Sequence, residues 1–281
     1  PYPDETHKIC LNSDAVLFGA VGDPKYDNDP TAKIRPEEGL LRMRKKLGLY
    51  ANIRPTYTFD SLLEKSPIKK SIIQGTDLVF VRELTGGIYF GKRGRNKTDD
   101  YAYDTCEYNV NEIKRLAKIG FELAMKRSKK LCCIDKANVL ETSRLWRQTV
   151  QSLEKNYPKV NVSYEFVDAV AMRLIHSPSY YDVLITSNLF GDILTDEASV
   201  ISGSMGLMPS ASVGVETSIY EPIHGSFPQA KGKNIANPLA TILSASMMFE
   251  RSFNLHEESK LIRDLVNESI SNNIVTKDLS G

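Results

Sequence analysis

The chain has 281 residues, of which 41% are hydrophobic and 25% are charged, so it is long enough for two domains or one large α/β unit. Its 36 basic and 35 acidic residues give a net charge of +1, which argues against a nucleic-acid-binding domain with a strongly basic face. No apolar run approaches the length of a membrane span.

The cysteine pattern indicates a cytosol-like compartment. Cys10, Cys106, Cys132 and Cys133 show no C-x-x-C spacing, and the last two are adjacent in a predicted strand, where they point to opposite faces. Buried, reduced thiols are therefore favoured over disulfides. We therefore expect a cytoplasmic protein.

Strand-like runs alternate with helical periodicity along the chain. Residues 13–18 form a predicted strand ending in the glycine-rich turn 19–24, and residues 76–81 form another that ends at Arg82. This alternation predicts an α/β fold, in which ligands gather beyond the carboxyl ends of strands. The predicted helices cover residues 37–47, 110–128, 142–155, 236–253 and 259–271.

The first of these helices has a mixed face. Glu37, Leu40, Leu41 and Arg44 follow one another at i, i+3, i+4 and i+7, so a carboxylate, two leucines and a guanidinium share one side. With Arg54 and Arg82, Arg44 belongs to a set of arginines that can bind carboxylates bidentately. The alternative, the commoner one for any single arginine, is a surface residue with a buried stem.

The segment 86–108 predicts an extended arm. Its glycines and basic residues lead into the alternating Tyr101, Tyr103, Thr105 and Tyr108. A lone arm cannot bury these aromatics against itself, so we expect it to pair with a second copy of the chain. An exposed hairpin is the alternative.

Acidic residues and a lysine at predicted strand ends suggest a metal site. Asp192 and Asp196 lie four apart on a predicted helix that follows the apolar run 182–186, and such oxygen ligands suit Mg²⁺ or Mn²⁺. The alternative is that acids simply favour a helix N-terminus. Asp168 interrupts another apolar run, where an unpaired charge is costly, so we expect a third acid at the same cation. Lys136 ends a predicted strand and suits a general base.

These motifs resemble the isocitrate/isopropylmalate dehydrogenase family, and within it the 3-isopropylmalate dehydrogenases. The resemblance covers essentially the whole chain, in order. It rests on Leu41–Arg44, Ala51–Pro55, Val81–Gly91, Asp135–Val139, Asn188–Asp196, Glu221–Ser226 and Ala236–Pro238.

The resemblance implies a two-domain α/β fold with a mixed sheet and a protruding dimerisation arm. Residues 1–49 and 202–281 would form the cofactor-binding domain, and residues 50–201, with the arm at 86–108, the domain for substrate, metal and dimerisation. It also implies a homodimer with shared active sites and no nucleic-acid or membrane partner. Relative to the family, the first strand and helix are missing and the C-terminus stops short, so we expect a fragment.

The resemblance implies a role for each site residue. Lys136 would be the base and Tyr89 the proton donor in the oxidative decarboxylation of 3-isopropylmalate to 2-oxoisocaproate by NAD⁺, a step of leucine biosynthesis. The metal, Mg²⁺ or Mn²⁺, would bind Asp192, Asp196 and the partner subunit's Asp168; Lys136 would also act across the dimer. Substrate contacts would come from Arg44, Arg54, Arg82, Glu37, Leu40, Leu41, Val139 and Asp168, and NAD contacts from Glu221, His224, Gly225, Ser226, Gln229 and Asn237.

Two features bear on specificity. Leu40, Leu41 and Val139 suit an isopropyl group, because a carboxylate buried against Leu40 would be costly. Gln229 stands where NAD-using members place an aspartate on the adenosine ribose, so it offers no charge repulsion against a 2′-phosphate. The alternatives are a sister enzyme acting on tartrate, homoisocitrate or isocitrate, and a non-catalytic regulatory subunit of the same fold.

Overall fold

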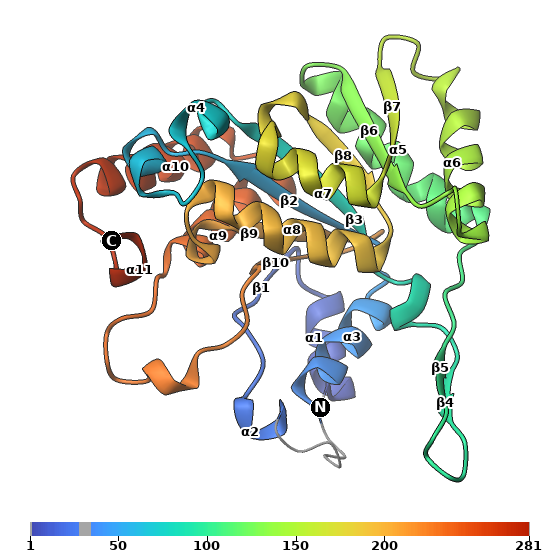
Figure 1. Ribbon diagram of the computed structural model, residues 1–281. Helices are drawn as coiled ribbons and strands as arrows, with labels where there is room; N and C mark the ends of the chain where they lie inside the picture. The colour runs from blue at the N-terminus through green and yellow to red at the C-terminus, as the bar shows by residue number, and fades with distance from the viewer. Residues whose placement is uncertain (1, 28–34, 281) are drawn as a thin grey trace. The chain divides into compact units, whose positions relative to one another are not determined.

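The computed structural model describes residues 2–27 and 35–280, along which helices and strands alternate (Figure 1). The predicted α/β fold is confirmed. Among the described residues, no helix is both long and apolar enough to cross a bilayer. By contact density the chain forms two compact units: Pro1–Leu49, Tyr57–Gln74 and Ser199–Gly281 make up the first, and Tyr50–Thr56 and Gly75–Ala198 the second.

These units differ from the predicted domains in two places. Residues 57–74 belong to the first unit, although they were predicted to lie in the domain 50–201. The first unit also resumes at Ser199, before the predicted boundary at residue 202. The reason is packing: Phe59 and Leu62 share a buried apolar cluster with Leu207, Leu243, Val266, Ile270 and Leu279. Burying each such side chain stabilises the fold by about 1.5–3 kcal/mol. Residues 1 and 281, the ends of the predicted cofactor-binding domain, lie outside the described residues, and the function of each unit stays a prediction.

The second unit is built on neighbouring strands in the order β2-β3-β8-β6-β7. β3 pairs with β8, β8 with β6 and β6 with β7, all in parallel. Their carboxyl ends therefore share one edge of the sheet, where Arg82 lies opposite Thr186, and Asp135 opposite Phe166. The strands are β2 (Ala51–Tyr57), β3 (Asp77–Glu83), β6 (Lys130–Asp135), β7 (Asn161–Phe166) and β8 (Val183–Thr186).

Helix α5 illustrates why the helices of this unit form and where they pack. Asn109 caps it by accepting from the Glu112 main chain, while Glu112 reaches back to the Asn109 main-chain N–H. A Cβ atom at Gly120 would lie only 2.3 Å from the Ile185 side chain, so the helix packs tightly on β8. The helices are α5 (Val110–Lys126), α6 (Glu141–Glu154), α7 (Val167–His176) and α8 (Asn188–Ser202).

The strands of the first unit run in both directions. β1 (Val16–Leu17) runs parallel to β10 (Ser218–Pro222), and β10 is antiparallel to β9 (Pro209–Val213). The predicted strand 13–18 is thus shorter than expected. The helices are α1 (Asp4–Leu11), α2 (Pro24–Asp27), α3 (Pro36–Lys46), α4 (Lys70–Ile73), α9 (Leu239–Ser252), α10 (His256–Ser271) and α11 (Lys277–Ser280).

The arm forms its own two-stranded sheet, in which β4 (Arg93–Arg95) and β5 (Ala102–Asp104) are antiparallel (Figure 1). Tyr101 and Tyr103 are exposed on it, and the pairing of the arm with a second chain stays a prediction. The prediction for Tyr108 is wrong. Its ring does not belong to the arm but packs edge-on against Trp146, with ring centroids 5.2 Å apart. The chain has left the arm before it reaches Tyr108.

Candidate active site

Arg82 and Tyr89 meet at the carboxylate of Asp192 in the second unit. The Arg82 guanidinium donates to one oxygen of Asp192, and the Tyr89 hydroxyl donates to the other at 2.7 Å. Burial acts to raise the pKa of Asp192, but the charge of Arg82 and the Tyr89 hydrogen bond outweigh it. The pKa of this carboxyl is therefore below its ordinary value, and Asp192 is ionised at neutral pH.

Tyr89 ends the short 3₁₀ turn Gly87–Tyr89, just beyond the carboxyl end of β3. Burial, followed by the hydrogen bond to Asp192, raises the pKa of its phenol to about 12. The phenol consequently keeps its proton at neutral pH. A protonated hydroxyl held by an ionised carboxylate can serve as a proton donor.

Arg54, on β2, points to the same helix. Its guanidinium donates to the Thr195 hydroxyl at 2.6 Å and to the Asn52 side-chain oxygen at 2.5 Å, and it lies 3.6 Å from an oxygen of Asp196. Asn52 and Arg54 are two residues apart and so share one side of the strand. The structure thus gathers Arg54, Arg82, Tyr89, Asp192 and Asp196, all of them predicted site residues.

Asp192 and Asp196 lie one helical turn apart on α8 and fit a divalent cation. Burial raises the pKa of Asp196; the Arg54 charge opposes this shift and the Asp192 charge adds to it. A cation beside both carboxylates would favour their ionised forms, and hard oxygen ligands suit Mg²⁺ or Mn²⁺. In residues 2–27 and 35–280, no three acidic, cysteine or histidine side chains gather into a metal-binding group.

The remaining predicted metal ligand, Asp168, lies with Lys136. Their Nζ and Oδ1 atoms are 2.5 Å apart, and this hydrogen bond lowers the pKa of Asp168. The sequence suggested that Asp168 is buried in an apolar run. This is wrong, because its side chain is 61% exposed. The reason is that β7 ends at Phe166, and Asp168 falls in the first turn of α7, where acids are favoured.

The main chain at Lys136 is fixed from both sides. Its N–H donates to the Ser143 hydroxyl at 3.0 Å, and the preceding Asp135 accepts from the Ala137 N–H at 2.9 Å. Asp135 is itself buried and binds Arg147 through both carboxylate oxygens, at 2.7 and 3.0 Å. This rigid turn at the end of β6 presents the lysine ammonium at the sheet edge where Arg82 also lies.

Asn188 is a site residue that the sequence analysis named only as the first residue of a motif. It is buried, and its side-chain oxygen accepts from two nitrogens of Arg82, at 2.8 and 3.1 Å. Thr195 plays a similar part for Arg54. The available signal was spacing, because positions 188, 192 and 195 share one face of a helix.

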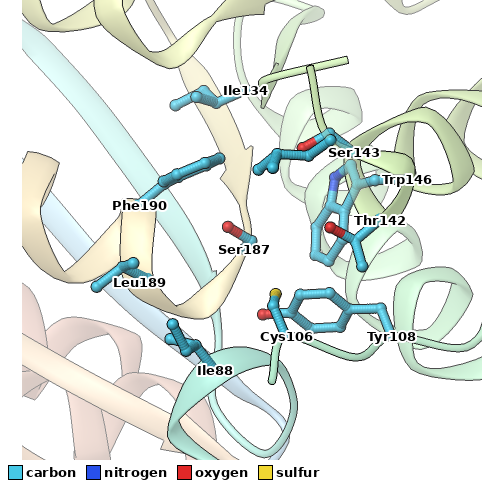
Figure 2. Close-up of a pocket in the computed structure, with 11 residues that line it drawn as sticks. Ile88, Cys106, Tyr108, Ile134, Thr142, Ser143, Trp146, Ser187, Leu189 and Phe190 are labelled. Carbon is cyan, nitrogen blue, oxygen red and sulfur yellow. The ribbon is translucent and has the colours of Figure 1, made fainter. Parts of the chain in front are cut away.

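An apolar cavity of about 180 Å³ opens in the second unit between the turn after β6 and the turn that holds Tyr89 (Figure 2). Ile88, Leu189 and Phe190 form one side, and Thr142, Ser143 and Trp146 the other. Val139 is not a cavity residue; it is 61% exposed on its own chain. Its contact with a substrate side chain stays a prediction.

In the first unit, Arg44 pairs with Glu221. Their side chains are 2.8 Å apart, and each is about nine-tenths buried, at 11% and 7% exposure. The Arg44 Nε is also buried and has no hydrogen-bond partner within the described chain. Leu40 and Leu41 are half-buried on the same helix, α3. A predicted substrate arginine and a predicted cofactor residue are thus direct partners.

Most of the other predicted cofactor residues lie on a largely exposed loop of the first unit. Gly225, Ser226 and Gln229 are exposed, and Ser226 donates to the main-chain oxygens of Gly22 and, at 3.3 Å, of Val21. Two turns are thereby held side by side with polar groups open to solvent, which fits a nucleotide. His224 is half-buried beside them.

Two more predicted contacts, Glu37 and Asn237, also belong to the first unit. A methyl group at Gly22 would lie 3.5 Å from a Glu37 carboxylate oxygen and 3.7 Å from the Ser226 hydroxyl, so Glu37 lies among cofactor residues. Asn237 donates to Asp278 at 3.0 Å and accepts from the Leu239 N–H at 2.9 Å, which fixes its side-chain amide. Asp278 belongs to α11 and was not predicted.

Comparisons with known proteins identify the family. The whole chain, residues 1–281, matches the family described as isocitrate/isopropylmalate dehydrogenase. A 3-isopropylmalate dehydrogenase of Bacteroides fragilis is 58% identical over 279 residues, which is 99% of this chain and 78% of the relative. One from Clostridium acetobutylicum is 54% identical over 283 residues, or 99% of this chain and 79% of the relative.

Solved structures agree with the sequence relatives. The crystal structure of isocitrate dehydrogenase from Methylococcus capsulatus superposes with a TM-score of 0.89 at 31% identity, covering 100% of this chain and 80% of the other. The TT0538 protein from Thermus thermophilus gives 0.88 at 29% identity, with 99% and 54% coverage. The chain therefore belongs to the isocitrate/isopropylmalate dehydrogenase family.

Proposed function

We propose that this chain is the catalytic subunit of an NAD-dependent 3-isopropylmalate dehydrogenase, which forms 2-oxoisocaproate and CO₂ in leucine biosynthesis. The observation that carries the proposal is the meeting of Arg82 and Tyr89 at ionised Asp192, next to Arg54 and Asp196. Close relatives named for the same reaction support it. A regulatory subunit without catalysis has no need of this arrangement.

Each side chain has a role that its chemistry permits. Arg54 and Arg82, both buried guanidinium groups with fixed geometry, bind the substrate carboxylates, together with Arg44. Lys136, in its neutral amine form, would accept the proton of the substrate hydroxyl. Bound NAD⁺ would supply the acceptor for the hydride from the carbon that bears this hydroxyl. After CO₂ departs, Tyr89 donates its proton to the substrate carbon that carried the lost carboxylate. Its pKa of about 12 keeps that proton available.

Asp192 and Asp196 would hold Mg²⁺ or Mn²⁺, and the bound cation would supply a Lewis acid at the substrate hydroxyl. The loop with His224, Gly225, Ser226 and Gln229, together with Glu221 and Asn237, would receive NAD. Asp168 and Lys136 would complete the partner subunit's site, since within one chain they bind each other. The arm would pair across the homodimer, and the cytoplasmic location stays a prediction.

The substrate assignment rests on the apolar character of Leu40, Leu41 and Val139. A mismatch of one methylene in an apolar pocket changes selectivity by only about 1–3 kcal/mol, but a carboxylate buried there without a partner costs more. The full-length protein is therefore assayed with Mg²⁺ against 3-isopropylmalate, isocitrate, homoisocitrate and tartrate. We expect 3-isopropylmalate to give the highest kcat/KM by far. Comparable values for isocitrate would refute the assignment, and turnover of none of the four would favour the regulatory subunit.

A further inference from the structure

Glu83, the last residue of β3, is a fully buried carboxylate that the proposed mechanism does not use. One oxygen accepts from the Thr85 main-chain N–H at 2.9 Å and from the Thr85 hydroxyl at 3.1 Å; the other accepts from the Gly86 N–H at 2.8 Å. Arg115 lies 3.9 Å away and donates to the Thr85 hydroxyl at 2.7 Å. A carboxylate so placed closes the turn that follows β3.

The same turn orients Arg82 through Asn188. The Gly86 carbonyl accepts from the Asn188 side-chain amide at 3.1 Å, which leaves the amide oxygen facing two nitrogens of Arg82. The remaining guanidinium nitrogen pairs with Asp192. The Glu83 carboxylate therefore acts on Arg82 through a series of three contacts: Glu83 with Gly86, Gly86 with Asn188, and Asn188 with Arg82. These contacts fix the orientation of the Arg82 guanidinium.

The turn also leads directly into Tyr89 and is tightly confined. A Cβ atom would lie 2.8 Å from the Tyr108 ring at Gly86, and 2.3 Å from the Tyr108 hydroxyl at Gly87, where φ is +73°. Tyr108 is held in place because its hydroxyl accepts from the Asn188 main-chain N–H at 2.9 Å. A shift of this turn would thus move Tyr89 and Arg82 together.

We infer that Glu83 is a positioning residue, which holds Tyr89 and Arg82 at their correct distance from Asp192. The inference rests on the proposed function, because Tyr89 is taken as the proton donor. Glu83 transfers no proton; it acts through its acceptor oxygens alone. Glutamine has the same size, but its amide NH₂ would face an N–H of Thr85 or Gly86, so at least one hydrogen bond becomes a contact between two donors.

The test compares Glu83→Gln with a matched control. Asp182, at the amino end of β8, is likewise a buried carboxylate: it accepts from the Ser128 main-chain N–H and hydroxyl and from Arg127. Both Glu83→Gln and Asp182→Asn in the full-length enzyme should lose thermal stability. Only Glu83→Gln should lower kcat, by roughly 10- to 100-fold, because a small misplacement of a reacting group has effects of this size. Equal kcat losses for the two variants would overturn the inference.

A second measurement separates positioning from general damage. In a Tyr89→Phe background, Glu83→Gln should lower kcat by about threefold or less, since the main residue through which it acts is gone. If Glu83→Gln lowers kcat by the same factor in the wild type and in Tyr89→Phe, the inference is overturned. If Glu83→Gln does not fold, Thr85→Val removes one hydrogen bond to Glu83 and should lower kcat in the same direction; an unchanged kcat would count against Glu83.

The two proposals fail in different ways. A wild-type enzyme that does not turn over 3-isopropylmalate refutes the proposed function. A wild-type enzyme that does, combined with a Glu83→Gln variant of equal kcat, refutes only the positioning role.

Discussion

Lys136 and Asp168 of one chain bind each other at 2.5 Å, although Lys136 directly follows β6 and Asp168 lies in the first turn of α7. Neither joins Asp192 in that chain, and Asp192 has Arg82 and Tyr89 as its own partners. The sheet edge thus presents two separate half-sites. In the proposed dimer, the half-site with Lys136 serves the other subunit.

This division predicts complementation between two inactive variants. Lys136→Met and Asp192→Asn should each abolish turnover alone. A mixed dimer of the two carries one intact site and one doubly broken site, so random exchange should restore roughly a quarter of the wild-type activity. Activity is measured after subunit exchange, with mixed dimers verified by mass spectrometry. A verified mixed dimer without activity would place both residues in the same subunit's site.

Replacing Tyr89 should affect the chemical step and not binding. Tyr89→Phe removes the proton donor, for which a loss in kcat of about 100-fold or more is expected, with little change in KM. Because the Tyr89 pKa is about 12, the phenol stays protonated through pH 10, and its ionisation cannot lower kcat between pH 7 and 10. The measurement is a pH–rate profile of both enzymes. The pKa of Tyr89 would be contradicted if kcat of the wild type fell between pH 7 and 10 and kcat of Tyr89→Phe did not.

Asp196 and Asp192 should affect stability in opposite directions when metal is absent. The raised pKa of Asp196 contributes stability below its unfolded value, and this is lost as pH rises through the folded pKa. At pH 7 with EDTA, Asp196→Asn should therefore raise the free energy of unfolding, by less than about 1 kcal/mol because the side chain is half exposed.

The lowered pKa of Asp192 contributes stability above its unfolded value, which is lost as pH falls, so Asp192→Asn should destabilise the protein at pH 7. Urea unfolding of wild type and both variants, with EDTA and with Mg²⁺, measures these effects. If both substitutions change stability in the same direction with EDTA, the electrostatic account of the pair is wrong.

Gln229 should make the enzyme less strict for NAD⁺ over NADP⁺ than relatives with an aspartate there. The side chain is exposed on the loop proposed to bind NAD and has no charge to repel a 2′-phosphate. The exposed Lys231 and Lys233 follow it. Gln229→Asp should raise the NAD⁺/NADP⁺ ratio of kcat/KM by roughly tenfold, mostly by weakening NADP⁺. Steady-state kinetics with both cofactors test this, and an unchanged ratio would place discrimination elsewhere.

Long periodic segments could be predicted from the sequence, because one helix or strand period continues over many residues. The helix predicted at 110–128 is α5, Val110–Lys126, whose apolar face and cap at Asn109 both lie within or beside the segment. The strand predicted at 13–18 forms only over Val16–Leu17. Strand length depends on the neighbouring strand, which periodicity along one segment does not describe.

The chemically distinctive residues of the site could be predicted, but their partners could not. Motif resemblance indicated Arg82, Tyr89 and Asp192, whereas the anchoring roles of Asn188 and Glu83 depend on contacts between segments about 100 residues apart or on one turn's geometry. Tyr108 was assigned to the arm because alternation continued in sequence after the strand had ended. The packing of Tyr108 against Trp146 is a tertiary contact, and it overrides local patterning.

The arm has a consequence for measuring assembly. A hairpin of two three-residue strands, β4 and β5, with Tyr101 and Tyr103 exposed, is only marginally stable in water by itself. Its amide hydrogens should therefore exchange with solvent quickly in an isolated subunit and slowly once a second chain covers it. Amide exchange at residues 93–104 would report subunit association directly, even in variants with no turnover.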